Sequence, residues 1–319
     1  MLLKAIEMAK ENKVLLAFCR RLIEIGLRVP DYIYRMASQE VMKKRLYEKC
    51  LTEIIEASEQ KNIEFLVFKS IKPFPYVGDD IDLLLPNEED FKFFIELLEG
   101  IGYQFLGCGP SEATLEKRIS GVSIQIDVHR KFSASYFPYL NRDRVWANKV
   151  KAKLNGYSVY VPSPEYDVLI VVGHSLIKEF RMKLSEFYHF VFSLPKIDWG
   201  KLNTLARIEK MDHALLIFGY VASQIYEALY SRKLLGVNFA NNRLLKLAYK
   251  AIKGSLKDGL SMPYYYPILL PFLGYLDKLK ASIFEGKRDS LDILLGFLKA
   301  PFTNREGINI LWKYIAKQA

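Results

Sequence analysis

The chain has 319 residues, of which half are hydrophobic, 13% are aromatic and 26% are charged. This balance excludes a mainly disordered chain, and the length suffices for one large domain or two of ordinary size. The formal net charge of +10 favours anionic partners, such as nucleotides, nucleic acid or an anionic membrane surface.

Neither cysteine usage nor hydropathy indicates an exported or membrane-spanning protein. Cys19, Cys50 and Cys108 match neither a disulfide framework nor a zinc ligand set. Charges at Lys4 and Glu7 interrupt the first segment, so we expect no signal peptide and a cytoplasmic location. Every apolar window is shorter than the run of about 18 to 20 residues that spans a bilayer, so we expect no membrane partner.

The pattern along the chain predicts an α+β protein in three parts. Residues 1–60 show helical periodicity broken at Pro30, which indicates two or three helices packed on the core. Residues 61–162 alternate between strand and helix patterns and predict a mixed β-sheet core. Residues 163–319 are helical in pattern and predict an all-helical carboxyl-terminal domain.

Two turn signals predict hairpins within the central part. Ser120-Gly121 separates strand patterns over 114–119 and 122–130, and Asn155-Gly156 separates 150–154 from 157–161. Further short strands are expected over 64–68, 81–85 and 103–106.

Two carboxylates lie two residues apart at the start of one of these strands. Because alternate strand residues share a face, Asp80 and Asp82 project side by side, while Ile81 and Leu83 face the other way. Like charges repel at this spacing unless a cation lies between them. A hard divalent ion such as Mg²⁺ binds through one or two carboxylates plus substrate phosphates, so the pair predicts a magnesium site.

A third carboxylate lies on the strand over 122–130. Strict alternation places Ser123, Gln125, Asp127 and His129 on its polar face. If this strand neighbours the one with Asp80 and Asp82, the three carboxylates can hold two Mg²⁺ ions about 3.5 to 4 Å apart, as in-line displacement at phosphorus requires. His129 is a candidate accessory residue, with a hydrogen-bonded structural histidine as the alternative.

This block resembles the DNA polymerase β-like nucleotidyltransferase superfamily. Its signature is a small-residue pair after a strand, then about ten residues, then Asp-hydrophobic-Asp, and later a lone Asp on a strand. Here nine residues, 71–79, separate Ser70 from Asp80-Ile81-Asp82, and Asp127 matches the lone aspartate. Residues 127–129, 164–174 and 197–199 resemble more particularly an uncharacterised nucleotidyltransferase branch with a helical carboxyl half. The resemblance covers roughly residues 60 to 220.

The signature departs from the family at one position. Lys69 replaces the usual glycine, which lets the backbone approach the triphosphate closely. The resemblance implies that Ser70 helps to bind the nucleotide, and Lys69 and Lys72 are candidates to contact its phosphates. The alternative is that Lys69 narrows or inactivates the site.

The resemblance implies Mg²⁺-dependent transfer of a nucleoside monophosphate from an NTP, ATP among the candidates, to an acceptor. The net charge and the basic and aromatic residues over 130–153 favour RNA as the acceptor, with tRNA as one candidate and a small molecule as the alternative. The alternative to catalysis is a degenerate nucleotide- or RNA-binding module of the same fold. The oligomeric state and the role of residues 240–319 do not follow from the pattern.

Overall fold

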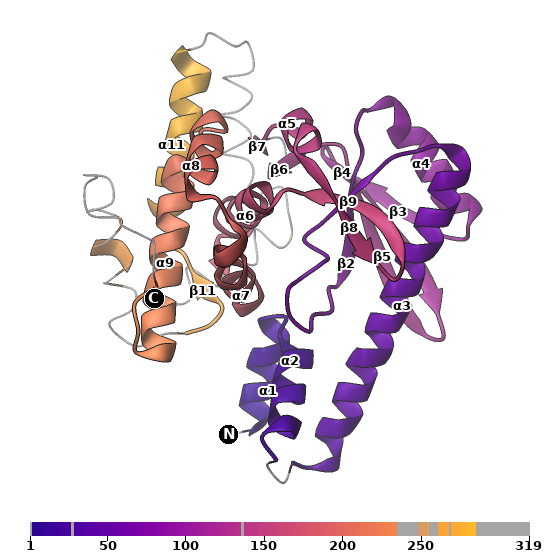
Figure 1. Cartoon of the computed structure of the whole chain (residues 1–319), viewed down its shortest axis with the longest axis horizontal. Helices are drawn as coiled ribbons and strands as arrows, with labels where there is room; N and C mark the ends of the chain where they lie inside the picture. Colours follow the sequence, from indigo (N-terminus) through magenta and orange to yellow (C-terminus); the bar gives the residue numbers. More distant parts are fainter. Residues whose placement is uncertain are drawn as a thin grey trace. The chain divides into compact units, whose positions relative to one another are not determined.

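The chain divides into two compact units in the computed structural model (Figure 1). Unit 1 comprises Met1–Phe132 and Asn141–Asp167, and unit 2 comprises Ser133–Leu140 and Val168–Ala319. The structure describes residues 2–26, 29–134, 137–234, 248, 250–252, 254, 261–267 and 269–284.

Unit 1 is built on a seven-stranded mixed sheet with the strand order β3-β4-β5-β2-β1-β9-β8. The pairs β2 with β5 and β1 with β9 are parallel, and the other neighbours are antiparallel. This confirms the predicted α+β fold class with a mixed sheet. The strands are β1 (Leu66–Phe68), β2 (Asp80–Leu84), β3 (Gln104–Cys108), β4 (Glu112–Ile119), β5 (Val122–His129), β8 (Lys149–Leu154) and β9 (Tyr157–Pro162).

Both predicted hairpins are present. β4 and β5 pair up to Ile119 and Val122, and β8 and β9 pair up to Leu154 and Tyr157. Both residues of each two-residue turn have positive φ, 48° at Asn155 and 89° at Gly156 in the second hairpin. A turn of this kind matches the twist of the flanking strands, which is why such residue pairs mark hairpins.

The helices of unit 1 are α1 (Leu2–Glu11), α2 (Leu15–Glu24), α3 (Asp31–Lys61), α4 (Glu89–Gly100) and α5 (Arg142–Ala147). The amino-terminal segment, for which two or three helices were expected, forms three, and α3 begins directly after Pro30. Asn87 lies two residues before α4, and its side chain accepts a hydrogen bond of 2.8 Å from the Asp90 amide in the first turn.

The core of unit 1 lies between one face of the sheet and the helices α3 and α4. Leu51 and Ile54 of α3 and Phe94 of α4 pack there with strand residues that include Ile81 and Ile126. Burying such a side chain fully contributes about 1.5 to 3 kcal/mol, so this face determines how the strands are oriented. The alternate residues of β2 and β5 consequently face away from α3 and α4.

Unit 2 is mainly helical and contains short strand pairs. Its described helices are α6 (Pro164–Val172), η1 (Gly173–Lys178), α7 (Leu184–Ser193), η2 (Leu194–Lys196), α8 (Trp199–Ile208), α9 (Asp212–Tyr230) and α11 (Leu269–Phe284). Of these, α6 begins in unit 1 and η1 is a π-helix. The short strands, which no turn signal predicted, pair as β6 (Phe132–Ala134) with β7 (Phe137–Leu140) and β10 (Arg181–Met182) with β11 (Tyr264–Tyr265).

Helices are thus confirmed for most of the described part of residues 163–319, but this part is not all-helical as predicted, because it also contains β10 and β11. The helices expected over 235–247 and beyond residue 284 lie outside the described residues. Within the described ranges, no helix combines the length and the apolar character needed to cross a membrane.

Candidate active site

The predicted carboxylates meet on the parallel pair β2 and β5. The register places Asp82 directly beside Asp127, and Leu84 beside His129. Asp82 and Asp127 lie on the face of the sheet opposite α3 and α4, because their neighbours Ile81, Leu83, Ile126 and Val128 fill the core. The two strands are neighbours, which is the condition stated above for the carboxylates to converge, and this pairing brings Asp82 and Asp127 together.

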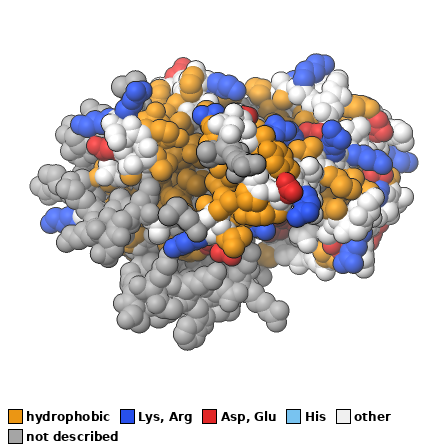
Figure 2. Space-filling view, turned by 90° about the horizontal axis from the view of Figure 1, so that it is seen from below, with side chains coloured by type: hydrophobic (Ala, Val, Ile, Leu, Met, Phe, Trp, Pro, Cys, Tyr) orange, Lys and Arg blue, Asp and Glu red, His pale blue; other side chains and the backbone are white. Residues whose placement is uncertain are grey.

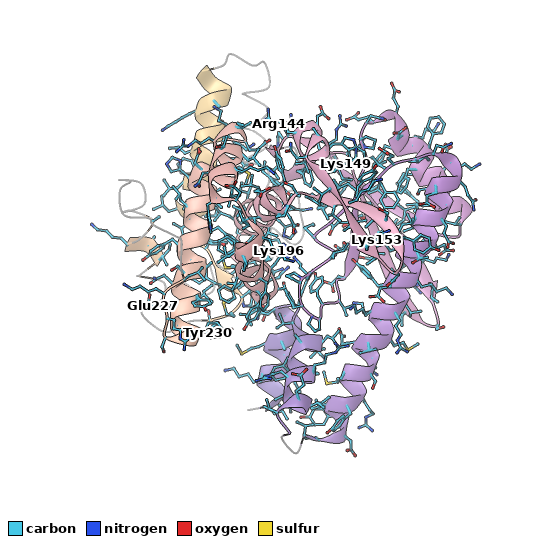
Figure 3. All side chains as sticks on the ribbon, in the orientation of Figure 1. Arg144, Lys149, Lys153, Lys196, Glu227 and Tyr230 are labelled. Carbon is cyan, nitrogen blue, oxygen red and sulfur yellow. The ribbon has the colours of Figure 1, made fainter. Side chains whose placement is uncertain are left out.

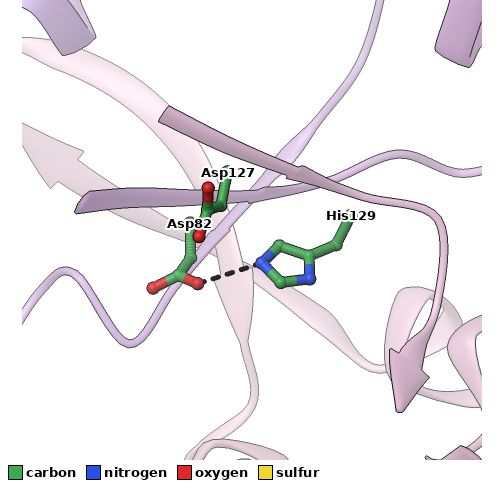
Figure 4. Close-up of side chains that lie close together, drawn as sticks. All are labelled: Asp82, Asp127 and His129. Carbon is green, nitrogen blue, oxygen red and sulfur yellow. Dashed lines mark hydrogen bonds and ion pairs between the residues drawn. The ribbon is translucent and has the colours of Figure 1, made fainter. Parts of the chain in front are cut away.

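Asp82, Asp127 and His129 form a compact group of ligand atoms (Figure 4). One side-chain atom from each lies within 4.8 Å of the other two. Two carboxylates at this separation fit a divalent cation, since Mg²⁺ prefers carboxylate oxygens and without a cation the like charges repel. Asp80 lies two residues before Asp82 on the same face of β2, but it is not one of the three.

His129 is held between two carboxylates. Its Nε2 lies 3.0 Å from Asp82 Oδ1, and its Nδ1 lies 3.1 Å from Glu112 Oε2. The Phe68 ring packs edge-on against the imidazole, with 4.9 Å between the ring centroids. Burial opposes protonation of His129, but the hydrogen bonds to Asp82 and Glu112 prevail and raise its pKa.

Asp127 is oriented by the neighbouring strand. The Thr114 hydroxyl donates a hydrogen bond of 2.7 Å to Asp127 Oδ1. Burial, followed by the charge of Asp82, raises the pKa of Asp127 above the ordinary value. Asp80 has a raised pKa for the same two reasons in the same order.

Lys69, which replaces the usual glycine, keeps a backbone conformation typical of glycine and adds a charged side chain. Its φ is 55°, which is the left-handed region that side chains other than glycine rarely adopt. The Lys69 ammonium lies 2.7 Å from Asp82 Oδ1, the same oxygen that contacts His129. Burial opposes ionisation of Asp82, but Lys69 and then His129 hold its pKa well below the ordinary value.

Ser70 and Lys72, the other predicted nucleotide-binding residues, lie on the loop between β1 and β2. Ser70 Oγ accepts a hydrogen bond of 3.0 Å from the backbone amide of Asp82, so Ser70 lies directly beside the cluster of Asp82, Asp127 and His129. The Lys72 ammonium lies 5.5 Å from the centre of the Tyr76 ring. Ser70, Lys72 and Tyr76 help to line a cavity of about 100 Å³ beside α3.

Three residues that contact the predicted site were missed. Glu112 and Thr114 could have been found, because counting back from the Ser120-Gly121 turn pairs them with His129 and Asp127. Tyr47 donates a hydrogen bond to the carbonyl oxygen of Asp80. No local pattern signals this contact, which joins positions 33 residues apart.

Comparison with known proteins shows which family the segment around this site is similar to. Residues 77–227 match the model of a protein family described as an uncharacterised nucleotidyltransferase. The match includes β2 and β5 with Asp80, Asp82 and Asp127. It confirms the resemblance to nucleotidyltransferases that the aspartate motif indicated. No curated protein sequence matches the chain.

Solved structures show distant similarity to about half of this chain. A crystal structure of ANT(2")-Ia in complex with adenylyl-2"-tobramycin is 15% identical, with a TM-score of 0.32 over 56% of this chain and 98% of that one. An antigenic nucleotidyltransferase-like protein from Paracoccidioides brasiliensis is 15% identical, with a TM-score of 0.36 over 53% and 92% of the two chains.

Proposed function

We propose that the protein is a metal-dependent nucleotidyltransferase, which moves a nucleoside monophosphate from an NTP to an acceptor and releases pyrophosphate. The observation that carries the proposal is the juxtaposition of Asp82 and Asp127 on neighbouring parallel strands. Their segment also matches a nucleotidyltransferase family. In the transfer, an acceptor oxygen forms a bond to the α-phosphorus while the bond from that phosphorus to the leaving pyrophosphate oxygen breaks.

Each predicted residue has a role in this proposal. Asp82 and Asp127 would hold a divalent cation, with Asp80 on the same strand face as a further oxygen ligand. Such an ion, when bound, lowers the pKa of an attacking hydroxyl and balances charge on the phosphates. Ser70 and Lys72, on the loop beside the carboxylates, would contact the triphosphate together with Lys69. His129 orients Asp82 through their hydrogen bond.

We propose RNA, with tRNA as the first candidate, as the acceptor. Its support is the net charge of +10 and the basic surface of α5 and β8. Arg144 and Lys153, which are labelled in Figure 3, are exposed there, and so is Lys151. The Lys149 ammonium lies 4.3 Å and 4.6 Å from the ring centres of Trp146 and Tyr160. Because Lys149 covers these rings, we expect phosphate contacts to contribute more than base stacking. Of the other aromatic residues in this stretch, Tyr136 and the Phe137 side chain lie outside the described residues.

The alternative acceptor is a small molecule. On the face drawn in Figure 2, Lys and Arg side chains are scattered among hydrophobic ones instead of forming one large patch. Such a distribution supports only modest attraction of a long polyanion.

The test measures Mg²⁺-dependent incorporation from each labelled NTP into total RNA, purified tRNA and a reaction without acceptor. Asp127→Asn removes a proposed metal ligand while keeping a side chain that can accept the Thr114 hydrogen bond. Asp31→Asn makes the same chemical change at an exposed position at the start of α3, outside both the carboxylates and the proposed RNA surface, and serves as the control. We expect labelling by wild type and Asp31→Asn and none by Asp127→Asn. Equal labelling by all three proteins would refute the assignment.

A non-catalytic module is the second candidate, and the ion pair between Lys69 and Asp82 is the observation that favours it. A protein that binds nucleotide without turning it over would release no pyrophosphate with any NTP or acceptor. Calorimetric binding of Mg²⁺ and NTP in the absence of pyrophosphate release would therefore identify this module.

A further inference from the structure

The ammonium of Lys69 places a positive charge of the protein itself beside Asp82. Its ammonium and His129 Nε2 both contact Asp82 Oδ1, at 2.7 Å and 3.0 Å. The same ammonium lies 5.3 Å from the centre of the Phe68 ring, which forms an apolar wall beside the pair. One oxygen of Asp82 thus already has two partners.

Burial makes this ion pair different from a surface contact. The side chains of Lys69 and Asp82 are 14% and 4% exposed. Water and salt screen a pair at this depth far less than they screen an exposed pair. The positive charge of Lys69 is therefore felt strongly by anything that approaches Asp82.

A divalent cation bound to Asp82 would compete with that charge. Mg²⁺ binds carboxylate oxygens at about 2.0 to 2.1 Å, closer than the ammonium nitrogen lies now. Two cations on one buried carboxylate repel each other, so an ion that binds through Asp82 must weaken or displace the Lys69 contact.

We propose that Lys69 competes with the divalent metal ion for Asp82 and thereby makes metal binding depend on the nucleotide. In the free protein the ammonium occupies Asp82 and keeps metal affinity low. The triphosphate of an NTP brings anionic oxygens that give the flexible Lys69 side chain another partner. This second half of the inference rests on the proposed nucleotidyltransferase function, whereas the competition itself does not.

The first arm of the test measures metal binding without nucleotide. Mn²⁺, which is detected directly by electron paramagnetic resonance, is titrated into full-length wild type, Lys69→Met and Lys69→Arg. We expect Lys69→Met to bind Mn²⁺ about tenfold or more tightly than wild type, since it lacks the competing charge. Lys69→Arg retains the charge and should bind as weakly as wild type.

Two further proteins make the comparison specific. Lys43→Met removes the same charge from a lysine 3.8 Å from Asp79, just outside the carboxylate group, and should leave Mn²⁺ affinity nearly unchanged. Adding Asp82→Asn to Lys69→Met should abolish the gain. Circular dichroism establishes that each variant is folded. Equal affinity of wild type and Lys69→Met, or an equal gain in Lys43→Met, would overturn the proposal.

The second arm adds a non-hydrolysable NTP analogue. In wild type the analogue should strengthen Mn²⁺ binding more than it does in Lys69→Met, because only wild type has a lysine to move. If no protein binds the analogue, the proposed function fails, while the arm without nucleotide still decides whether Lys69 competes with the metal. If the analogue strengthens binding equally in both proteins, metal binding does not depend on nucleotide through Lys69.

Discussion

Asp80 and Asp82 lie two residues apart on one strand, yet their charges have opposite effects on stability. Asp82 is buried and paired with Lys69 and His129, which keep its pKa low. Asp80 has a raised pKa because burial and the charge of Asp82 oppose its ionisation. The ionised form is thus stabilised at one position and penalised at the other.

We therefore expect Asp80→Asn and Asp82→Asn to differ in stability, although both should lose transferase activity. Asp82→Asn leaves the Lys69 ammonium without its carboxylate and should lower the free energy of unfolding by about 3 kcal/mol. Asp80→Asn removes a penalised charge and should change it by no more than about 1 kcal/mol, in the stabilising direction. Urea unfolding at neutral pH measures both, and equal destabilisation would contradict the assigned environments.

The backbone at Lys69 gives a second residue-level prediction. A left-handed φ of 55° costs an L side chain about 1 to 2 kcal/mol, and glycine avoids this cost. Lys69→Gly and Lys69→Ala lose the same ammonium, so the loss of the ion pair cancels between them. We expect the glycine variant to be the more stable of the two by about 1 kcal/mol in urea unfolding. An alanine variant of equal stability would show that the position tolerates a side chain freely.

Strand alternation explains how much of the site could be predicted. It places Asp82, Asp127 and His129 on one face, and the observed register brings them together. Alternation ends at Phe68, where β1 ends, and the left-handed residue that follows redirects the chain. The contact between Lys69 and Asp82 depends on this reversal and on a long flexible side chain, so no residue pattern indicates it. Which of these residues act in catalysis stays a prediction.

At the scale of elements, structures that depend on local residues could be predicted, whereas the pairing of strands far apart in the sequence could not. Both hairpins follow from two-residue turns, whose conformation depends on the turn residues themselves. The parallel pairs β2 with β5 and β1 with β9 join strands far apart in sequence. Their order depends on how the strands bury their apolar faces against α3 and α4, which periodicity does not encode. The strands β10 and β11, of two residues each, are too short to show a period at all.

The segment around η1 contains a second buried ionic cluster, which is confined to unit 2. Glu179 Oε2 lies 2.6 Å from Lys183 Nζ and 3.0 Å from Arg181 Nε, and Glu179 Oε1 lies 3.4 Å from His174 Nε2. His174 Nδ1 also lies 3.2 Å from Glu186 Oε1. Although burial opposes ionisation of Glu179, the charges of His174, Lys183 and Arg181 hold its pKa well below 4.5.

This cluster predicts a pH dependence with a definite sign. A carboxylate whose pKa is lower in the folded than in the unfolded state stabilises the fold above the unfolded value, near 4.5 for Glu179, and this contribution is lost as pH falls through the folded value. Glu179→Gln should therefore be less stable than wild type at neutral pH by about 3 kcal/mol, and the difference should shrink as the pH falls below about 4.5.

Urea unfolding over a pH series measures this difference. Glu227→Gln changes an exposed carboxylate on α9 and should parallel wild type throughout (Figure 3). A gap between Glu179→Gln and wild type that stays constant with pH would contradict the linkage.

At the scale of the whole molecule, the order of strand and helix patterns along the chain predicted the fold class but not the division of the chain into its two units. The mixed sheet and the helical remainder follow from where strand and helix patterns occur. The observed units interleave, because Ser133–Leu140 belongs to unit 2 while Asn141–Asp167 returns to unit 1. Such a crossing depends on tertiary contacts, so the division at residues 61 and 163 stays a prediction.

The net charge of the molecule leads to the last prediction, which concerns the proposed RNA acceptor. Each lysine or arginine that contacts a phosphate releases counterions, so affinity falls with salt by a slope of about 0.7 to 0.9 per contact on logarithmic axes. Replacing Arg144, Lys151 and Lys153 together by alanine should reduce this slope for tRNA by about 2 to 3, as fluorescence anisotropy over a salt series would measure.

The matched control is the triple alanine variant of Lys196, Arg207 and Lys210, which are also exposed and carry the same total charge on unit 2. If both triple variants lower the slope equally, the attraction comes from net charge alone and the surface of α5 and β8 is not the binding site. If only the first does, phosphate contacts are localised on the unit that carries Asp82 and Asp127, as transfer to an RNA acceptor requires.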